Sequence, residues 1–206
     1  DLTYEAFDLA EKWRMPVMIL ADGMIGQMME GVTFKPDRDL ASLPKMEWAV
    51  GDQYKTHRGI HHVTSLNLDP TTFEVDIKKR YARYDEIRKA EIRYEEVDIE
   101  DADLVFVAYG TSSRICLGAL EAARAQGLKL GLFRPISLWP FPYGRIAELA
   151  KKGKRFLTVE MSMGQMVEDV RLAVDGKTKV DFYGRCGGVI PSEEEVLAEA
   201  KRLLGR

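Results

Sequence analysis

One short polar run in this sequence has residue types suited to chemistry: Gly110, Thr111, Ser112 and Ser113. It follows an apolar stretch, 104–108, and precedes a helical pattern, so it is expected at the start of a helix that follows a buried strand. Backbone amides and hydroxyls at a helix start can hold a phosphate or a carboxylate. The same residue types also serve as ordinary helix caps that bind no ligand. We therefore treat these four residues as a candidate anion or ligand contact and keep the cap as the alternative.

Two other groups of residues could carry chemistry. The histidines His57, His61 and His62 gather in HRGIHH, but their spacing fits no standard zinc pattern and the nearest cysteine is far along the chain. We expect no metal site there. Glu160 follows an apolar run and could be a buried acid with a raised pKa. Pairing of its carboxylate with a backbone amide or a neighbouring arginine is the favoured interpretation.

Composition and missing motifs exclude several classes of protein. The 206 residues carry a formal net charge of −3, which favours neither nucleic acid nor an anionic membrane as a partner. No apolar run approaches the roughly 20 residues that cross a bilayer. Neither GxGxxG nor GxxxxGK[ST] occurs, so no dinucleotide or nucleoside triphosphate site is indicated. Cys116 and Cys186 form no CxxC pair, which leaves no iron–sulfur ligand set and suits a reducing cytoplasm.

Strand and helix patterns alternate through the second half of the chain. Strands are predicted at 104–108, 128–133, 155–159 and 178–182, and helices between them at about 115–125, 143–152 and 164–174. A last helix opens at Ser192, where Glu195 three residues later completes a capping box. This alternation predicts an α/β fold, a three-layer sandwich with a mostly parallel sheet.

The first half of the chain is organised differently. A helix over 1–14, a buried strand over 16–21 and a short helix after it cannot bury a core of their own. Residues 1–32 are therefore interpreted as the end of a truncated upstream α/β domain. Residues 33–96 are expected to be a connection that ends in a long charged helix, from 70 to about 95, with a narrow apolar stripe. The last domain is expected to span 97–206.

Several strings of this sequence resemble one known family. ADGMIGQMMEGV at 21–32, preceded by YEAFDLAEKWRMPVMIL, is similar to the end of the first domain in the alpha-type chain of the 2-oxoacid:ferredoxin oxidoreductases. AYGTSSRICLGALEAARAQGLKLGLFRPISLWPFP, VEMSMGQMVEDV and GRCGGVIPSEEEVL resemble, in order, the following domain of that chain. The similarity is greatest to the 2-oxoisovalerate-type members. It implies a last domain that resembles the transketolase C-terminal domain.

The resemblance implies an oxidoreductase that decarboxylates a 2-oxoacid, passes electrons through iron–sulfur clusters to ferredoxin and transfers the acyl group to coenzyme A. Thiamine diphosphate, Mg²⁺ and the clusters would belong to the full complex, with beta, gamma and ferredoxin-like delta subunits as partners. No catalytic, cofactor-binding or metal-binding residue can be carried over to this chain. It is expected to be cytoplasmic, to serve assembly and shaping of the site, and to be inactive alone.

Two alternative functions keep the same fold. The last domain could be a small-anion or nucleotide-binding regulatory module that uses 110–113 as its cradle. It could also be the transketolase-like domain of a 2-oxoacid dehydrogenase beta chain. The ADGMIGQMME string favours the ferredoxin oxidoreductase over both. Within that family, branched-chain substrates are favoured over other 2-oxoacids.

Overall fold

A computed structural model describes residues 1–43, 46, 48–50 and 61–206. Its packing contacts divide the chain into two compact units. The first unit comprises residues 1–20 and 28–86, and the second comprises residues 21–27 and 87–206. The sequence-based division at 32/33 and 96/97 stays a prediction. The second unit, as the contacts define it, already includes the residues from 87 to 96.

The second unit is built on a five-stranded sheet with the strand order β1-β3-β2-β4-β5. Its strands are β1 (Tyr94–Val97), β2 (Leu104–Val107), β3 (Leu130–Pro135), β4 (Arg155–Glu160) and β5 (Val180–Gly184). β2 pairs in parallel with both β3 and β4, and β4 pairs in parallel with β5. Only β1 runs antiparallel, along the free side of β3. The predicted mostly parallel sheet is confirmed.

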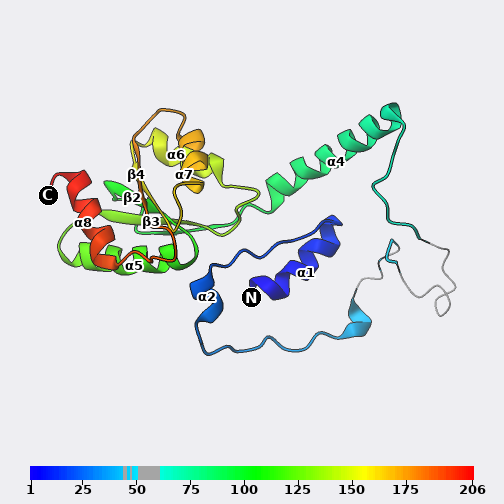
Figure 1. Cartoon of the computed structure of the whole chain (residues 1–206), viewed down its shortest axis with the longest axis horizontal. Helices are drawn as coiled ribbons and strands as arrows, with labels where there is room; N and C mark the ends of the chain where they lie inside the picture. Colours follow the sequence, from blue (N-terminus) through cyan, green and yellow to red (C-terminus); the bar gives the residue numbers. More distant parts are fainter. Residues whose placement is uncertain (44–45, 47, 51–60) are drawn as a thin grey trace. The chain divides into compact units, whose positions relative to one another are not determined.

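Four helices cover the two faces of this sheet (Figure 1): α5 (Gly110–Ala125), α6 (Tyr143–Lys151), α7 (Met166–Val174) and α8 (Glu193–Leu204). On the face of α5 and α8, Leu104 and Phe106 of β2 are buried with Leu157 of β4. On the face of α6 and α7, the intervening residues Val105 and Val107 are buried instead. Because side chains alternate along a strand, an unbroken apolar run fills both cores at once. The predicted three-layer sandwich is therefore confirmed.

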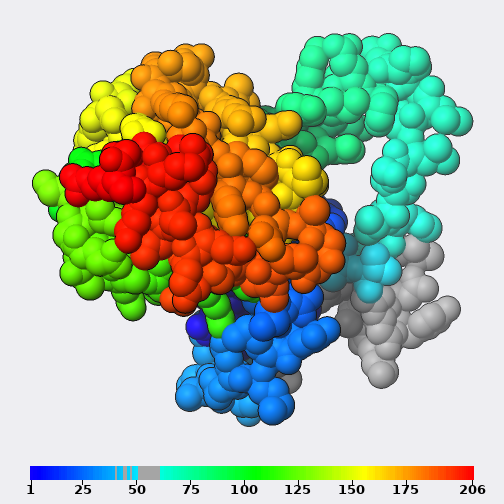
Figure 2. All heavy atoms as spheres, turned by 60° about the vertical axis from the view of Figure 1, so that its left-hand side comes forward, coloured from blue at the N-terminus to red at the C-terminus, as the bar shows by residue number. Residues whose placement is uncertain are grey.

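Helix α8 begins at the predicted capping box. The backbone N–H of Glu195 donates to the Ser192 hydroxyl at 3.2 Å, and the Glu195 carboxylate accepts from the Ser192 N–H at 2.9 Å. Val196 and Ala200 then bury one side of the helix against the sheet, one turn apart. The helix, red in Figure 2, lies at the surface of the second unit.

The end of the long charged helix was predicted wrongly. Helix α4 (Pro70–Ala90) stops short of the predicted end near Glu95, and Tyr94–Val97 forms the antiparallel edge strand β1. The Tyr94 ring stacks on Phe133 with centroids 5.0 Å apart, and Glu95 accepts from Arg134 at 2.7 Å. The charged pattern of α4 continues through these residues, but pairing with β3 makes them a strand. Along α4 itself Ile87 is buried, whereas Tyr81 is 55% exposed.

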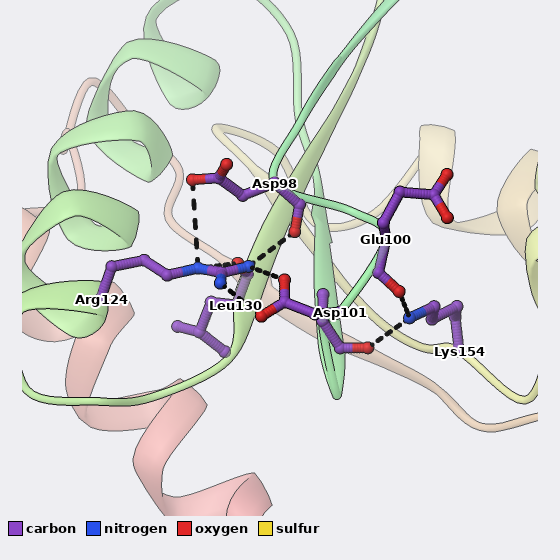
Figure 3. A network of polar contacts seen from close by, with 7 residues as sticks. Asp98, Glu100, Asp101, Arg124, Leu130 and Lys154 are labelled. Carbon is purple, nitrogen blue, oxygen red and sulfur yellow. Dashed lines mark hydrogen bonds and ion pairs between the residues drawn. The ribbon is translucent and has the colours of Figure 1, made fainter.

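A polar network ties together the amino edge of the sheet (Figure 3). The Arg124 guanidinium donates to both carboxylate oxygens of Asp101 at 2.9 and 2.8 Å and to the carbonyls of Leu130 and Asp98 at 2.8 and 2.6 Å. The Lys154 ammonium donates to two further carbonyls of the same loop. Each cation donates to backbone carbonyls around the loop before β2, so this network has a structural role.

The first unit differs from its prediction at one strand. Helices α1 (Leu2–Trp13) and α2 (Gly23–Gln27) form as expected, although α2 belongs to the second unit. Residues 16–21 form no strand, and the side chain of Met18 is 78% exposed. An apolar run becomes a strand only when a neighbouring strand takes its backbone hydrogen bonds. The described residues of the first unit supply no such neighbour.

The segment after α2 packs on α1 through two cations. Arg38 forms a bidentate pair with Asp8 and donates to the Tyr4 hydroxyl at 2.6 Å, while Lys35 pairs with Glu5 at 3.3 Å. Residues 40–42 form a short 3-10 turn, η1 (Leu40–Ser42). Within the described parts of the chain, no helix has both the length and the apolar character needed to cross a bilayer.

Candidate functional site

The fold points to one place on the second unit where a ligand site is expected. From β2 the chain enters α5 on one face of the sheet, and from β4, the neighbouring parallel strand, it enters α7 on the opposite face. Ligands in open α/β sheets bind outside the carboxyl ends of strands at such a reversal. The N-termini of α5 and α7 meet this edge, and the candidate residues 110–113 and 160 lie at those two N-termini.

The N-terminus of α5 already holds an anionic group, the carboxylate of Asp22. The backbone N–H of Thr111 donates to Asp22 Oδ2 at 3.0 Å, and the Thr111 hydroxyl donates to Oδ1 at 2.9 Å. Ser112 and Ser113 are buried, and the Ser113 hydroxyl donates to the carbonyl of Gly110 at 2.8 Å. The run thus contacts an anion through Thr111, and in this structure that anion is a side chain of the same polypeptide.

The Asp22 carboxylate also begins helix α2. The backbone N–H of Ile25 donates to Oδ1 at 2.9 Å, which makes Asp22 the cap of its own short helix. Burial acts to raise the pKa of this carboxyl, but hydrogen bonds from the Ile25 backbone and from the backbone and hydroxyl of Thr111 outweigh burial. The net effect holds the pKa of Asp22 below its ordinary value, so the group is ionised at neutral pH.

The N-terminus of α7 is filled in the same manner by Glu160. Its side chain is buried, and its two oxygens accept from the backbone N–H groups of Gln165, Met166 and Val167 at 3.0, 3.1 and 2.9 Å. The Ser162 hydroxyl donates to the same carboxylate at 3.0 Å. The favoured prediction for Glu160, pairing with a backbone amide or an arginine, is confirmed, and the partners are backbone amides. These four donors make the Glu160 carboxylate a cap of α7.

Tyr109 is a third titratable residue near this edge of the sheet. It is the last residue before α5, and its ring packs against the core on the α6 and α7 side. Burial raises the pKa of its phenol, and the negative charges of Glu160 and Asp22 raise it further. The phenol is therefore neutral at physiological pH and keeps its proton as a hydrogen-bond donor.

Among the remaining sequence candidates, the structure describes His61, His62, Cys116 and Cys186. His57 lies outside the described residues, and in the described part of the chain no group of three or more His, Cys, Asp or Glu side chains is arranged to hold a metal ion. Burial in α5 raises the pKa of the Cys116 thiol, whereas Cys186 is exposed.

The N-termini of α5 and α7, which could otherwise receive a diphosphate, both hold carboxylates. The described residues at this edge of the sheet therefore do not fit a thiamine diphosphate and metal centre.

Sequence reasoning missed the role of Asp22. An acidic residue directly before a short helix is a recognisable cap signal, and ADGMI carries it. The second contact joins residues 89 positions apart in sequence. No local pattern encodes such a contact, so only the tertiary structure could reveal that one carboxylate caps two helices.

The sequence of this chain is similar to a known protein family and to several named proteins. Residues 102–196 match the family model described as "Pyruvate:ferredoxin oxidoreductase core domain II". The ketoisovalerate oxidoreductase subunit VorB of Methanothermobacter thermautotrophicus is 44% identical, over 100% of this chain and 57% of that protein. The 2-oxoglutarate synthase subunit KorA of Methanothermobacter marburgensis is 30% identical, over 96% of this chain and 59% of that protein. This chain thus spans somewhat more than half the length of these curated relatives.

A solved structure shares the fold. The 2-oxoglutarate:ferredoxin oxidoreductase from Magnetococcus marinus, determined with 2-oxoglutarate, coenzyme A and succinyl-CoA bound, aligns with a TM-score of 0.58. The alignment covers 70% of this chain and 24% of that one, at 22% sequence identity. At that identity the likeness concerns the fold alone.

Proposed function

We propose that this chain, which belongs to the 2-oxoacid:ferredoxin oxidoreductases, is part of an enzyme that oxidatively decarboxylates a branched-chain 2-oxoacid to its acyl-CoA. The observation that carries the proposal is the 44% identity to the ketoisovalerate oxidoreductase subunit along the entire chain. The 2-oxoglutarate synthase subunit reaches 30% over nearly the same span. The difference favours a branched substrate over 2-oxoglutarate.

Within that enzyme, the chain would serve assembly and the shaping of the site. Its strongest acceptors at the carboxyl edge of the sheet, Asp22 and Glu160, are committed to helix N-termini. Thiamine diphosphate, Mg²⁺ and the iron–sulfur clusters would be held by other parts of the complex, where the cofactor supplies the carbanion chemistry. The expected partners are beta, gamma and ferredoxin-like delta subunits, together with ferredoxin and coenzyme A. The expected location is the cytoplasm.

Substrate choice is tested on the assembled complex. Ferredoxin reduction would be followed with 2-oxoisovalerate, 2-oxoglutarate and pyruvate as alternative substrates, each with thiamine diphosphate and coenzyme A. The proposal expects kcat/KM for 2-oxoisovalerate to exceed the other two by at least about tenfold, which corresponds to about 1.4 kcal/mol of transition-state discrimination. A preference for 2-oxoglutarate or pyruvate would contradict the branched-chain assignment.

The accessory role is tested with the chain by itself. The 206-residue polypeptide, supplied with thiamine diphosphate, Mg²⁺, 2-oxoisovalerate, coenzyme A and ferredoxin, is expected to give no acyl-CoA. The complete complex under the same conditions is the positive control. Turnover by the isolated chain would show that the chemistry resides in it.

A further inference from the structure

Residues 21–27 are placed unusually in this molecule. The packing contacts assign them to the second unit, although the chain on both sides of them, 1–20 and 28–86, belongs to the first. We call residues 21–27 the docking segment. It consists of Ala21, Asp22 and the short helix α2. A seven-residue segment inserted in this way needs a specific contact to hold it on the second unit.

Asp22 provides that contact. Its Oδ1 accepts from the N–H of Ile25, inside the docking segment, and from the hydroxyl of Thr111 on α5, both at 2.9 Å. Its Oδ2 accepts from the Thr111 N–H at 3.0 Å. One carboxylate therefore caps α2 and α5 together. Hydrogen bonds to an ionised acceptor are roughly twice as strong as neutral ones, and the helix N-terminus adds a favourable dipole.

The backbone of α5 is shaped to admit the carboxylate. Gly110 has φ +60°, and a Cβ added there would lie 2.9 Å from Asp22 Oδ2. The same Cβ would lie 3.7 Å from Cδ1 of Ile25, so the apolar side of the docking segment also packs at this point. A side chain at residue 110 would be strained by its positive φ and would push the carboxylate away. The absence of a side chain thus allows the close approach.

We propose that the docking segment is an intramolecular latch, in which the Asp22 carboxylate seated on Thr111 fixes the chain between residues 20 and 28 to the second unit. Asp22 is a positioning residue in this role. The N-terminus of α5 is then a receptor for a carboxylate of this chain, and a soluble anion is not its natural occupant. The latch stands independently of the substrate and of the proposed enzyme activity.

Interspin distances in the full chain test the latch directly. Spin labels would be placed on Gln27→Cys in the docking segment and Glu121→Cys on α5, both exposed positions, in a Cys186→Ser background. The buried Cys116 stays unlabelled. The expected distribution is narrow for the parent chain and clearly broader for Asp22→Ala. Thr111→Val, which removes only the hydroxyl donor, is expected to broaden it partly, and Thr111→Ser to restore it.

Hydrogen exchange adds a local readout, and Ser192→Ala is the matched control. With Asp22→Ala, the amides of Ile25 and Thr111 are expected to exchange roughly fivefold to tenfold faster, the range expected for loss of an N-cap. Ser192→Ala removes a cap from α8 in the same unit and should leave both amides and the interspin distance unchanged. A distribution that stays narrow in Asp22→Ala, or broadens equally in Ser192→Ala, overturns the latch.

Inorganic phosphate separates the latch from a ligand site. Millimolar phosphate added to the parent chain is expected to change neither the distance distribution nor the exchange of Thr111. If phosphate broadens the distribution while protecting the Thr111 amide, the carboxylate is a displaceable occupant of an anion site, and the latch is overturned.

Discussion

Two acidic residues decide the character of the carboxyl edge of this sheet. Asp22 and Glu160 each turn both carboxylate oxygens toward backbone N–H groups at a helix start. A carboxylate that accepts from these N–H groups cannot act as a general base without leaving its cap. At the scale of the residue, these two carboxylates therefore stabilise helix N-termini, and Asp22 also holds the docking segment on the second unit.

Replacing Glu160 by glutamine should destabilise the second unit by about 2 kcal/mol. The amide would turn a donor toward the N–H groups of Gln165, Met166 and Val167, leaving buried donors unpaired. Urea unfolding followed by circular dichroism measures the change. Glu168→Gln, an exposed change in the first turn of the same helix, is the control and should stay within about 0.5 kcal/mol of the parent. Equal midpoints for both variants would contradict the assigned role.

The latch should release at acidic pH. The folded pKa of Asp22 is lowered, so its contribution is fully present above the unfolded value of about 3.9 and is lost as the pH falls through the folded value. Exchange at Thr111, compared between the parent chain and Asp22→Asn from pH 6 to pH 2, should differ at the upper end and converge at the lower end. Because the two proteins differ only at residue 22, the difference between their exchange rates reports the Asp22 carboxylate. A difference independent of pH would contradict this prediction.

Among the elements, α5 connects both edges of the sheet. Its first turn receives Asp22 at the carboxyl edge, and Arg124 in its last turn binds the loop before β2 at the amino edge (Figure 3). The loop approaches β3 closely, since a Cβ at Gly131 would lie 3.0 Å from the Asp98 carbonyl. The helix thereby adds contacts at both edges to the direct pairing of β2 with β3.

Arg124→Ala should lower the free energy of unfolding by about 1 to 2 kcal/mol. Most of the loss comes from the carbonyls of Asp98 and Leu130, which lose their donors, because the ion pair with Asp101 is exposed and weak. Differential scanning calorimetry would show the drop. Arg202→Ala, which removes a surface pair within α8, serves as the comparison and should change Tm little. If both substitutions lower Tm equally, the carbonyl contacts contribute nothing specific.

At the scale of the whole molecule, the two units differ in how they treat apolar residues. The second unit buries its apolar runs between layers, as at β2 and β4. In the first unit, Met18, Met29 and Phe34 are exposed at 78%, 98% and 89%. In the proposed complex, such exposed apolar side chains would be expected to contact a partner.

Amide exchange can test that interpretation along the run 17–20. These residues form no strand, so their amides should exchange within seconds to minutes in the isolated chain, far faster than those of β2. In the assembled complex the same amides should become protected, because the apolar run would then gain a partner. Protection in the isolated chain, or none in the complex, would contradict the prediction.

Local patterns were sufficient for most of the second unit. The apolar run of β2, the helix after it and the capping box of α8 each depend on neighbours within a few residues, and each was predicted with its type and approximate bounds. The incorrect predictions concern segments whose strand partner would be distant in the sequence. Residues 94–97 form a strand because they pair with β3. Residues 16–21 have the composition of a strand but form none, because no neighbouring strand pairs with them among the described residues.

By itself, the sequence determined the α/β class, the order of the elements from β2 to α8, the preference for a paired Glu160 and the family resemblance. Periodicity, caps and motif strings encode these features within short windows. Only the tertiary structure decided the occupant of the α5 N-terminus, because the contact between Asp22 and Thr111 joins segments 89 residues apart. Hydrogen bonds across that separation depend on the folded backbone, which at Gly110 leaves room for the carboxylate beside the helix.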